Sequence, residues 1–110
     1  MINWQRVDEL RDEIGAEDFL EVVELFLEEV QEVVDRLGSA PDPARYEEDM
    51  HFLKGSAVNL GFQSFAELCA VSEKNSAAGQ TGLVDVAGLI GAYNDSRSQF
   101  LTKLDSRAAA

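Results

Sequence analysis

The residues best suited to chemistry lie in one stretch, 51–61, and at one carboxylate further along the chain. His51 is the only histidine in the 110 residues. At ~100° per residue of a helix, it lies about 140° from Tyr46 and well off the apolar face of its segment. Its imidazole should therefore point outward, where a ring nitrogen can act as a nucleophile. The apolar face itself has the 4-3-4-3 spacing of a core-facing helix and consists of Tyr46, Met50, Leu53, Ala57 and Leu60.

Two residues one helical turn after His51 are informative. Lys54 supplies a cation that could neutralise an anionic group arriving at the imidazole. Gly55 leaves no side chain at the i+4 position, although glycine costs ~1 kcal/mol against alanine inside a helix. A partner that fits closely over His51 would explain why this cost is tolerated.

Glu73 is the second unusual residue, because it falls on the apolar face of its predicted helix, where an unpaired carboxylate is costly. His51 lies ten residues before Gly61 and Glu73 lies twelve after it. At ~1.5 Å per residue, both are about 15–18 Å from that turn, and so at the same height on adjacent antiparallel helices. A carboxylate that accepts a hydrogen bond from one imidazole nitrogen leaves the other with a lone pair.

Three other interpretations compete with this one. Glu48 and His51 form Glu-x-x-His, a ligand unit of di-iron bundles, but such sites need a second unit. A Ser-His-acid arrangement is disfavoured, because Ser56 lies on a different helical face and no strand-turn-helix elbow exists. Glu73 could also be solvated near a helix end, paired with Lys74 or with nothing, and the spacing leaves this possibility open.

Composition limits the location and the partners. The formal charge is −12, from 9 Lys and Arg against 21 Asp and Glu, which disfavours nucleic acid and membrane surfaces as partners. The acidity either serves solubility or complements a partner with a basic rim. The single cysteine, Cys69, cannot form an internal disulfide, which fits a reducing compartment. Because no membrane-length apolar run or signal layout is present, we expect a cytoplasmic protein.

The periodic runs and two prolines predict an all-α chain. Short connections favour an antiparallel up-down four-helix bundle with a short N-terminal helix packed on it, as one domain over residues 1–110. The last helix contains Gly88 and Gly91, which makes its middle the hardest part to assign, and residues 106–110 are expected to fray. The expected helices run from the N-cap Asn3 to Gly15, over 16–37, from Pro43 to about Gly61, over 62–78 and over 83–104.

The stretch around His51 and the order of the predicted helices both resemble those of a known protein family. The run His-Phe-Leu-Lys-Gly-Ser-Ala-Val-Asn-Leu-Gly at 51–61 resembles the signature of histidine-containing phosphotransfer (HPt) domains. The layout of a short first helix, a long acidic second helix, a proline-rich break, a histidine helix and a fifth helix resembles that family over nearly the whole chain. The resemblance implies a four-helix bundle without an enzymatic domain of its own.

The resemblance also implies roles for individual residues. His51 would match the phospho-acceptor, which takes a phosphoryl group from an aspartate on a response-regulator receiver domain and passes it to another. Lys54 would match the lysine that contacts the phosphoryl oxygens, and Gly55 the glycine that leaves room for the aspartyl pocket. Glu73 departs from the common pattern, which has glutamine, and resembles the glutamate of the phospho-accepting domain in chemotaxis-type histidine kinases. The source of the phosphoryl group is therefore open between a receiver and a separate histidine kinase.

We expect a phosphoryl carrier in two-component signalling and not an enzyme, because the chain has no kinase catalytic or nucleotide-binding motif. It should be a monomer without a cofactor or metal of its own, and Mg²⁺ would come from the receiver. A helical adaptor that binds receivers without carrying phosphate is the alternative. The predicted core stripe of the second helix consists of Phe19, Val23, Phe26, Val30, Val33 and Leu37, flanked by Leu20, Val22, Leu27 and Val34. Leu25 falls about 120° from the centre of this stripe, among acids. Such a lone leucine usually has no role, but beside a docking site it would be a contact. The expected partner-docking residues are Leu25, Glu47, Glu48 and Val58.

Overall fold

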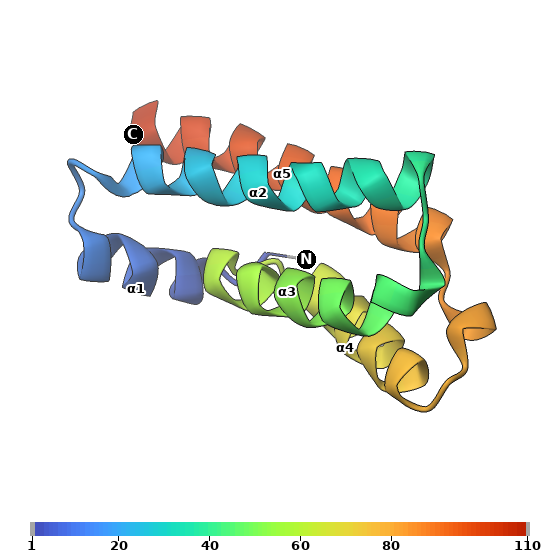
Figure 1. The fold of residues 1–110 in the computed structure, drawn as a ribbon. Helices are drawn as coiled ribbons and strands as arrows, with labels where there is room; N and C mark the ends of the chain where they lie inside the picture. The colour runs from blue at the N-terminus through green and yellow to red at the C-terminus, as the bar shows by residue number, and fades with distance from the viewer. Residues whose placement is uncertain (1, 110) are drawn as a thin grey trace.

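The computed structural model describes the backbone of residues 2–109 and the side chains of residues 2–106. Over these residues the chain folds into helices joined by short turns, so the predicted all-α bundle is confirmed (Figure 1). The α-helices are α1 (Trp4–Ile14), α2 (Phe19–Ser39), α3 (Tyr46–Leu60), α4 (Gln63–Ala77) and α5 (Val86–Ala109), and two 3₁₀ turns are η1 (Pro43–Arg45) and η2 (Thr81–Leu83).

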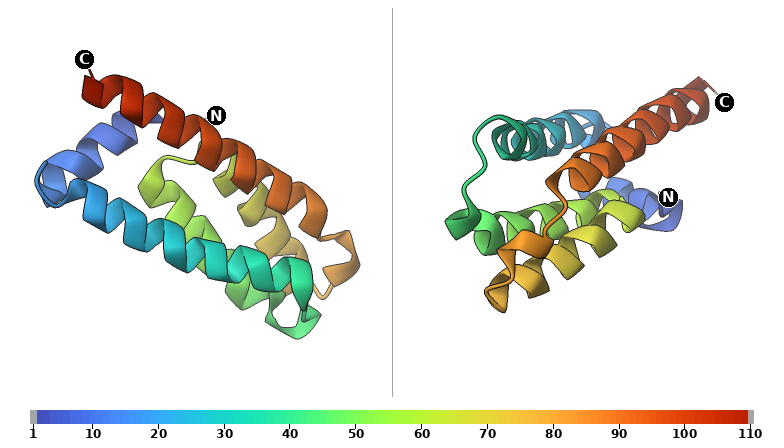
Figure 2. Two further views of the ribbon diagram at one scale, coloured as in Figure 1. Left: turned by 90° about the horizontal axis from the view of Figure 1, so that it is seen from above. Right: turned by 90° about the vertical axis from the view of Figure 1, so that its right-hand side faces the viewer.

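The helices form two layers. In Figure 1, α2 and α5 lie above α3 and α4, and the colour order shows that each of these four helices runs opposite to the one before it. The end-on view in Figure 2 shows the same layering. The short α1 continues the lower layer beyond the end of α3. In the part of the chain that the structure describes, no helix is long and apolar enough to cross a membrane.

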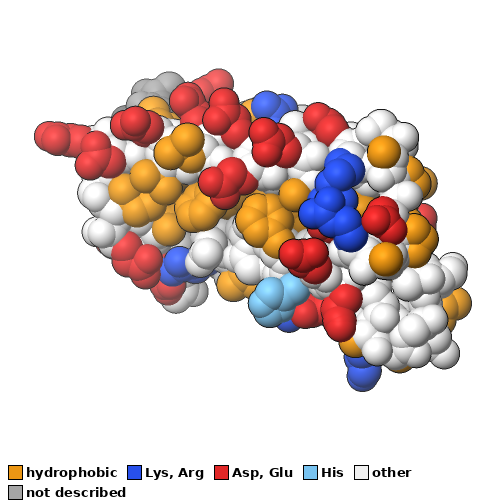
Figure 3. Space-filling view, in the orientation of Figure 1, with side chains coloured by type: hydrophobic (Ala, Val, Ile, Leu, Met, Phe, Trp, Pro, Cys, Tyr) orange, Lys and Arg blue, Asp and Glu red, His pale blue; other side chains and the backbone are white. Residues whose placement is uncertain are grey.

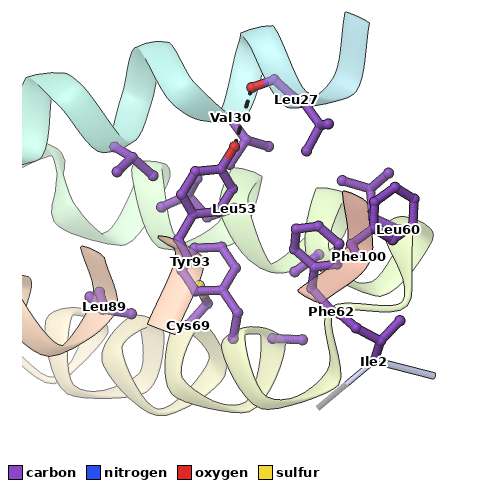
Figure 4. Close-up of a cluster of buried hydrophobic side chains, with 14 of the residues drawn as sticks. Ile2, Leu27, Val30, Leu53, Leu60, Phe62, Cys69, Leu89, Tyr93 and Phe100 are labelled. Carbon is purple, nitrogen blue, oxygen red and sulfur yellow. Dashed lines mark hydrogen bonds between the residues drawn. The ribbon is translucent and has the colours of Figure 1, made fainter. Parts of the chain in front are cut away.

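The core is built around aromatic side chains from α5 and from the start of α4. Phe62, at the start of α4, packs edge-on against Phe100 of α5 with ring centroids 5.4 Å apart. Tyr93 of α5 is fully buried, and its hydroxyl donates a hydrogen bond of 3.5 Å to the carbonyl oxygen of Leu27 in α2 (Figure 4). The Phe62–Phe100 contact ties the two layers together, and the Tyr93–Leu27 hydrogen bond joins α5 to α2 within the upper layer. In the lower layer, α3 and α4 lie side by side.

The turn between α3 and α4 depends on a glycine. Gly61 has a φ of 75°, in the left-handed region, and the N–H of Phe62 donates to the carbonyl oxygen of Ala57 at 2.8 Å, which closes a Schellman-type cap. The carbonyl oxygen of Gly61 accepts a hydrogen bond of 2.7 Å from the N–H of Asn3. A Cβ at position 61 would lie only 2.6 Å from the carbonyl oxygen of Asn3. Gly61 is thus required both by its backbone angle and by the close passage of the N-terminal segment.

Several helix boundaries differ from expectation. Residues 16–18 form a turn before α2 begins at Phe19, after the positive φ of Gly15 ends α1. At its other end, α2 extends to Ser39, whose hydroxyl donates to the carbonyl oxygen of Asp35 at 2.9 Å. Pro43 opens a 3₁₀ turn that leads directly into α3, and not α3 itself.

The last helix also starts later than predicted. Leu83 belongs to the exposed turn η2. The side chain of Asp85 accepts a hydrogen bond from the N–H of Gly88 at 2.9 Å, which starts α5 at Val86. The helix continues through Gly88 and Gly91 and past Ser106 to Ala109, whereas we expected fraying over 106–110. Ala110, the last residue of that segment, lies outside the described residues.

We predict that Gly61→Ala lowers the free energy of unfolding by about 2 kcal/mol or more, because alanine is strained at this φ and its methyl group meets Asn3. Urea unfolding followed by circular dichroism measures the change. Gly55→Ala is the matched control, because a Cβ at that helical position would meet no atom within 4 Å. It should stabilise the protein by about 0.5–1 kcal/mol. An unfolding free energy unaffected by Gly61→Ala would contradict this account of the turn.

Candidate functional site

The side chain of His51 stands on the outer surface of α3. It is 73% exposed, and its Nδ1 lies 2.8 Å from Oε2 of Glu73 on α4. The contact expected from the spacing around Gly61 is therefore present in the structure. With Glu73 ionised, Nδ1 must carry the proton and donate it, and in the neutral imidazole Nε2 then keeps a free lone pair directed away from Glu73.

Lys54 completes a three-residue cluster with the same carboxylate. Its Nζ donates to Oε1 of Glu73 at 2.5 Å, so each carboxylate oxygen of Glu73 has one partner. Sequence reasoning had assigned Lys54 to an incoming anion and had left Lys74 as a candidate partner of Glu73. In the structure the cation next to Glu73 is Lys54, which reaches it from the same helix as His51.

The cluster has a clear electrostatic consequence. The hydrogen bond from Lys54 lowers the pKa of Glu73, partial burial opposes this shift, and the hydrogen bond from His51 lowers the pKa further. Glu73 is therefore a carboxylate at neutral pH and acts as an acceptor only. The net result is a histidine held in one tautomer by a fixed negative charge.

The surface beside His51 is open. Gly55 is exposed, and a Cβ built there would meet no atom within 4 Å, so the chain itself has no need of a glycine at this position. Val58, one turn further along α3, is 54% exposed. His51, Gly55 and Val58 therefore form a ridge with free access from solvent.

The other expected docking residues lie on α3 and on α2. Glu47 and Glu48 are exposed on the first turn of α3, and Leu25 is 53% exposed on α2. Sequence reasoning overlooked Phe52, which is 36% exposed next to His51. In Figure 3 a band of hydrophobic side chains runs between α2 and α3, with acidic groups along it and the histidine below it.

The α2 side of this band was predicted incorrectly in one detail. Phe26 and Val33 were expected to be part of the core stripe of α2, but they are only partly buried. Leu27 and Val34 occupy the inner positions instead. This rotation arises because α2 packs against both α3 and α5, and it leaves Phe26 and Val33 at the edge of the core.

The structure also contains an ion pair that sequence reasoning missed. Arg36 of α2 donates two hydrogen bonds to Asp49 of α3, at 2.9 Å from Nη1 to Oδ2 and 2.7 Å from Nη2 to Oδ1. Asp49 lies within about 40–60° of Tyr46 and Leu53 around α3, so a carboxylate on an apolar face was visible in the sequence. The test that singled out Glu73 would have found it.

Two other kinds of chemistry find no support among the described side chains. Burial raises the pKa of the Cys69 thiol to about 12, so it is neutral and shielded from reactants. No group of three His, Cys, Asp or Glu residues within residues 2–106 is placed to hold a metal ion.

Comparison with known proteins gives one match. The family model of the Hpt domain matches residues 21–106, which include α3, α4, His51 and Glu73 and exclude α1. No curated protein and no solved structure matches the chain. Because the family model covers most of the 110 residues and the matched region contains the exposed histidine, the chain belongs to the Hpt domain family.

Proposed function

We propose that this chain accepts a phosphoryl group on Nε2 of His51 from an aspartyl phosphate of a receiver domain and passes it to the aspartate of another. The observation that carries the proposal is the hydrogen bond between Nδ1 of His51 and Glu73, made by a histidine whose side chain is 73% exposed. Members of this family act in phosphorelay signalling as phosphoryl carriers. A separate histidine kinase is the other donor compatible with this site.

The proposed reaction needs little from the chain beyond positioning and charge. The Nε2 lone pair attacks phosphorus, the bond from phosphorus to the aspartyl oxygen breaks, and the partner recovers its carboxylate. The imidazole becomes a positively charged phospho-imidazolium, whose Nδ1–H remains bonded to the Glu73 carboxylate. That carboxylate stabilises charge that develops only during transfer, which is the kind of interaction that accelerates a reaction. In this proposal Mg²⁺ would come from the receiver and would neutralise charge on the phosphoryl oxygens.

Lys54 would act in the second half of this proposal. A phosphoryl group on Nε2 places about two negative charges one helical turn from its ammonium. The flexible lysine chain can turn from Glu73 toward those oxygens without moving the backbone. In the unphosphorylated protein Lys54 binds Glu73, and in the phosphorylated protein it would stabilise the phosphoryl group.

We propose that the partner docks on a face centred on His51 and comprising Leu25, Glu47, Glu48, Phe52 and Val58. Exposed apolar side chains with acidic groups among them suit a receiver that presents an apolar patch and basic groups. Gly55 lies within this face, where the absence of a side chain lets the partner approach the histidine.

His51→Gln should abolish labelling by a ³²P-phosphorylated receiver while the unfolding curve stays close to that of wild type, because the imidazole is largely exposed. Acid treatment of the labelled wild-type protein should release the label, as expected of phosphohistidine. Label retained by the His51→Gln protein would refute the carrier function. A receiver complex that forms without any label on wild type would favour the adaptor.

Glu73→Gln should slow transfer about tenfold, because glutamine still accepts from Nδ1–H but lacks the charge, and Glu73→Ala should slow it about a hundredfold. Initial rates of transfer from a phosphorylated receiver measure both effects. Glu67→Ala is the control, since it removes an exposed glutamate from the same helix. Equal rates for all four proteins would show that the carboxylate plays no part in transfer.

Gly55→Leu should keep the fold and yet reduce transfer from a receiver by about a hundredfold or more, because the new side chain stands where the partner must approach. Phosphoramidate, a small donor that needs no docking surface, should still label His51. Gly91→Leu is the matched control, because Gly91 is an exposed helical glycine with equally open surroundings on α5. Normal transfer by the Gly55→Leu protein would mean that partners approach from another direction.

A further inference from the structure

Asp49 is unusual among the charged residues of this chain. Within residues 2–106 it is the only charged residue that is buried, with 4% of its surface exposed. Both of its oxygens are bound by Arg36, whose side chain is 29% exposed. A carboxylate removed from water in this way must be matched by a partner with good geometry, and the two parallel hydrogen bonds provide that match.

Stability alone does not explain this pair. Buried ion pairs can often be replaced by apolar residues without loss of stability, because the cost of desolvation offsets most of the attraction. Leu37 of α2 and Met50 of α3, each next in sequence to a member of the pair, are fully buried in the common apolar core. What apolar packing lacks is direction, whereas a planar guanidinium bound to both oxygens of a carboxylate permits one relative placement of the two helices.

The Arg36–Asp49 pair lies close to the residues proposed to dock the partner. Asp49 precedes His51 by two residues on α3, and Arg36 comes from α2. The two residues line the groove between these helices together with Glu32, Val33, Glu48 and Phe52. The groove therefore includes residues from both helices of the proposed docking face.

The chemistry of His51 belongs to a different pair of helices. His51 and Lys54 meet Glu73 across the interface of α3 with α4, which the Gly61 turn holds together. None of the three contacts Arg36 or Asp49 through a hydrogen bond or ion pair that the structure shows. The α3–α4 pair thus holds the acceptor, and the α2–α3 pair assembles the surface around it.

We propose that Arg36 and Asp49 are positioning residues that set the height and rotation of α3 against α2, and that they thereby determine how well a receiver docks and not how readily His51 accepts phosphate. This inference rests on the proposed phosphoryl transfer. The new element is that partner docking depends on the Arg36–Asp49 ion pair, whereas the acceptor chemistry of His51 does not.

The test replaces both members at once, by Arg36→Met with Asp49→Leu, so that no buried charge is left alone. For the double variant, KM for a phosphorylated receiver should rise about tenfold, since small displacements of a docking surface are costly. Labelling by phosphoramidate should stay within about twofold of wild type, because the α3–α4 cluster is a separate unit. Glu13→Leu is the control, because it removes an exposed ion pair of 3.1 Å within α1 and leaves in place the hydrogen bond from Arg6 to Asn59 of α3. It should leave both activities unchanged.

A structural readout does not depend on phosphate. In the double variant, nuclear Overhauser contacts between α2 and α3 should change while those between α3 and α4 persist. If the double variant does not fold, Arg36→Lys serves instead, because lysine keeps the charge but loses the two-pronged geometry. It should raise KM in the same direction by a smaller factor.

Several results would overturn the inference. An unchanged receiver KM in a folded double variant would leave the pair with no positioning role. Equal losses with the receiver and with phosphoramidate would place its effect on the acceptor chemistry. If wild type takes phosphate from phosphoramidate but from no receiver, the proposed function is wrong. In that case, unchanged contacts between α2 and α3 in the double variant would reject the positioning role as well.

Discussion

The close pairing of α3 with α4 through the turn at Gly61 is the constraint on which the site depends. Gly61 reverses the chain within a single residue of left-handed backbone, so the two helices lie side by side. Positions equally distant from the turn then face each other, and this places Glu73 opposite His51. The N-terminal segment is held at the same turn, because the N–H of Asn3 donates a hydrogen bond to the carbonyl oxygen of Gly61. One backbone angle thus governs the height at which a carboxylate meets the histidine.

The arrangement gives Glu73 a role that changes with the state of the histidine. In the free protein its charge is shared between Lys54 and the Nδ1–H of His51. We propose that on transfer the positive charge on the imidazole grows while Lys54 is drawn to the phosphoryl oxygens. The carboxylate of Glu73 would then interact more strongly with the imidazole of His51 as Lys54 moves away. A glutamine at this position could orient the ring but could not balance a growing positive charge.

The sequence allowed much of this to be predicted, for identifiable reasons. Helix periodicity and the glycine at position 61 predicted the bundle and the His51–Glu73 contact, because both follow from local geometry. The place of Lys54 was not predictable in the same way, since a long flexible side chain can reach either an incoming anion or a neighbouring carboxylate. The buried side of α2 was assigned partly wrong at Phe26 and Val33, because a helix with two neighbours buries a broader face than a single stripe suggests. Asp49 was overlooked although its position on an apolar face indicated a partner, and that partner, Arg36, comes from a different helix.

The central claim is that Glu73 keeps the proton on Nδ1 and leaves Nε2 to carry the phosphoryl group. The most direct measurement is nuclear magnetic resonance of protein with ¹⁵N-labelled histidine, before and after phosphorylation, using the coupling between ³¹P and ¹⁵N. Because His51 is the only histidine, both ring-nitrogen signals belong to it, and their different couplings to the ring protons distinguish Nδ1 from Nε2. The account predicts a protonated Nδ1 in both states and a bond from phosphorus to Nε2 in the second. Phosphorus bound to Nδ1, or a free protein with its proton on Nε2, would contradict it.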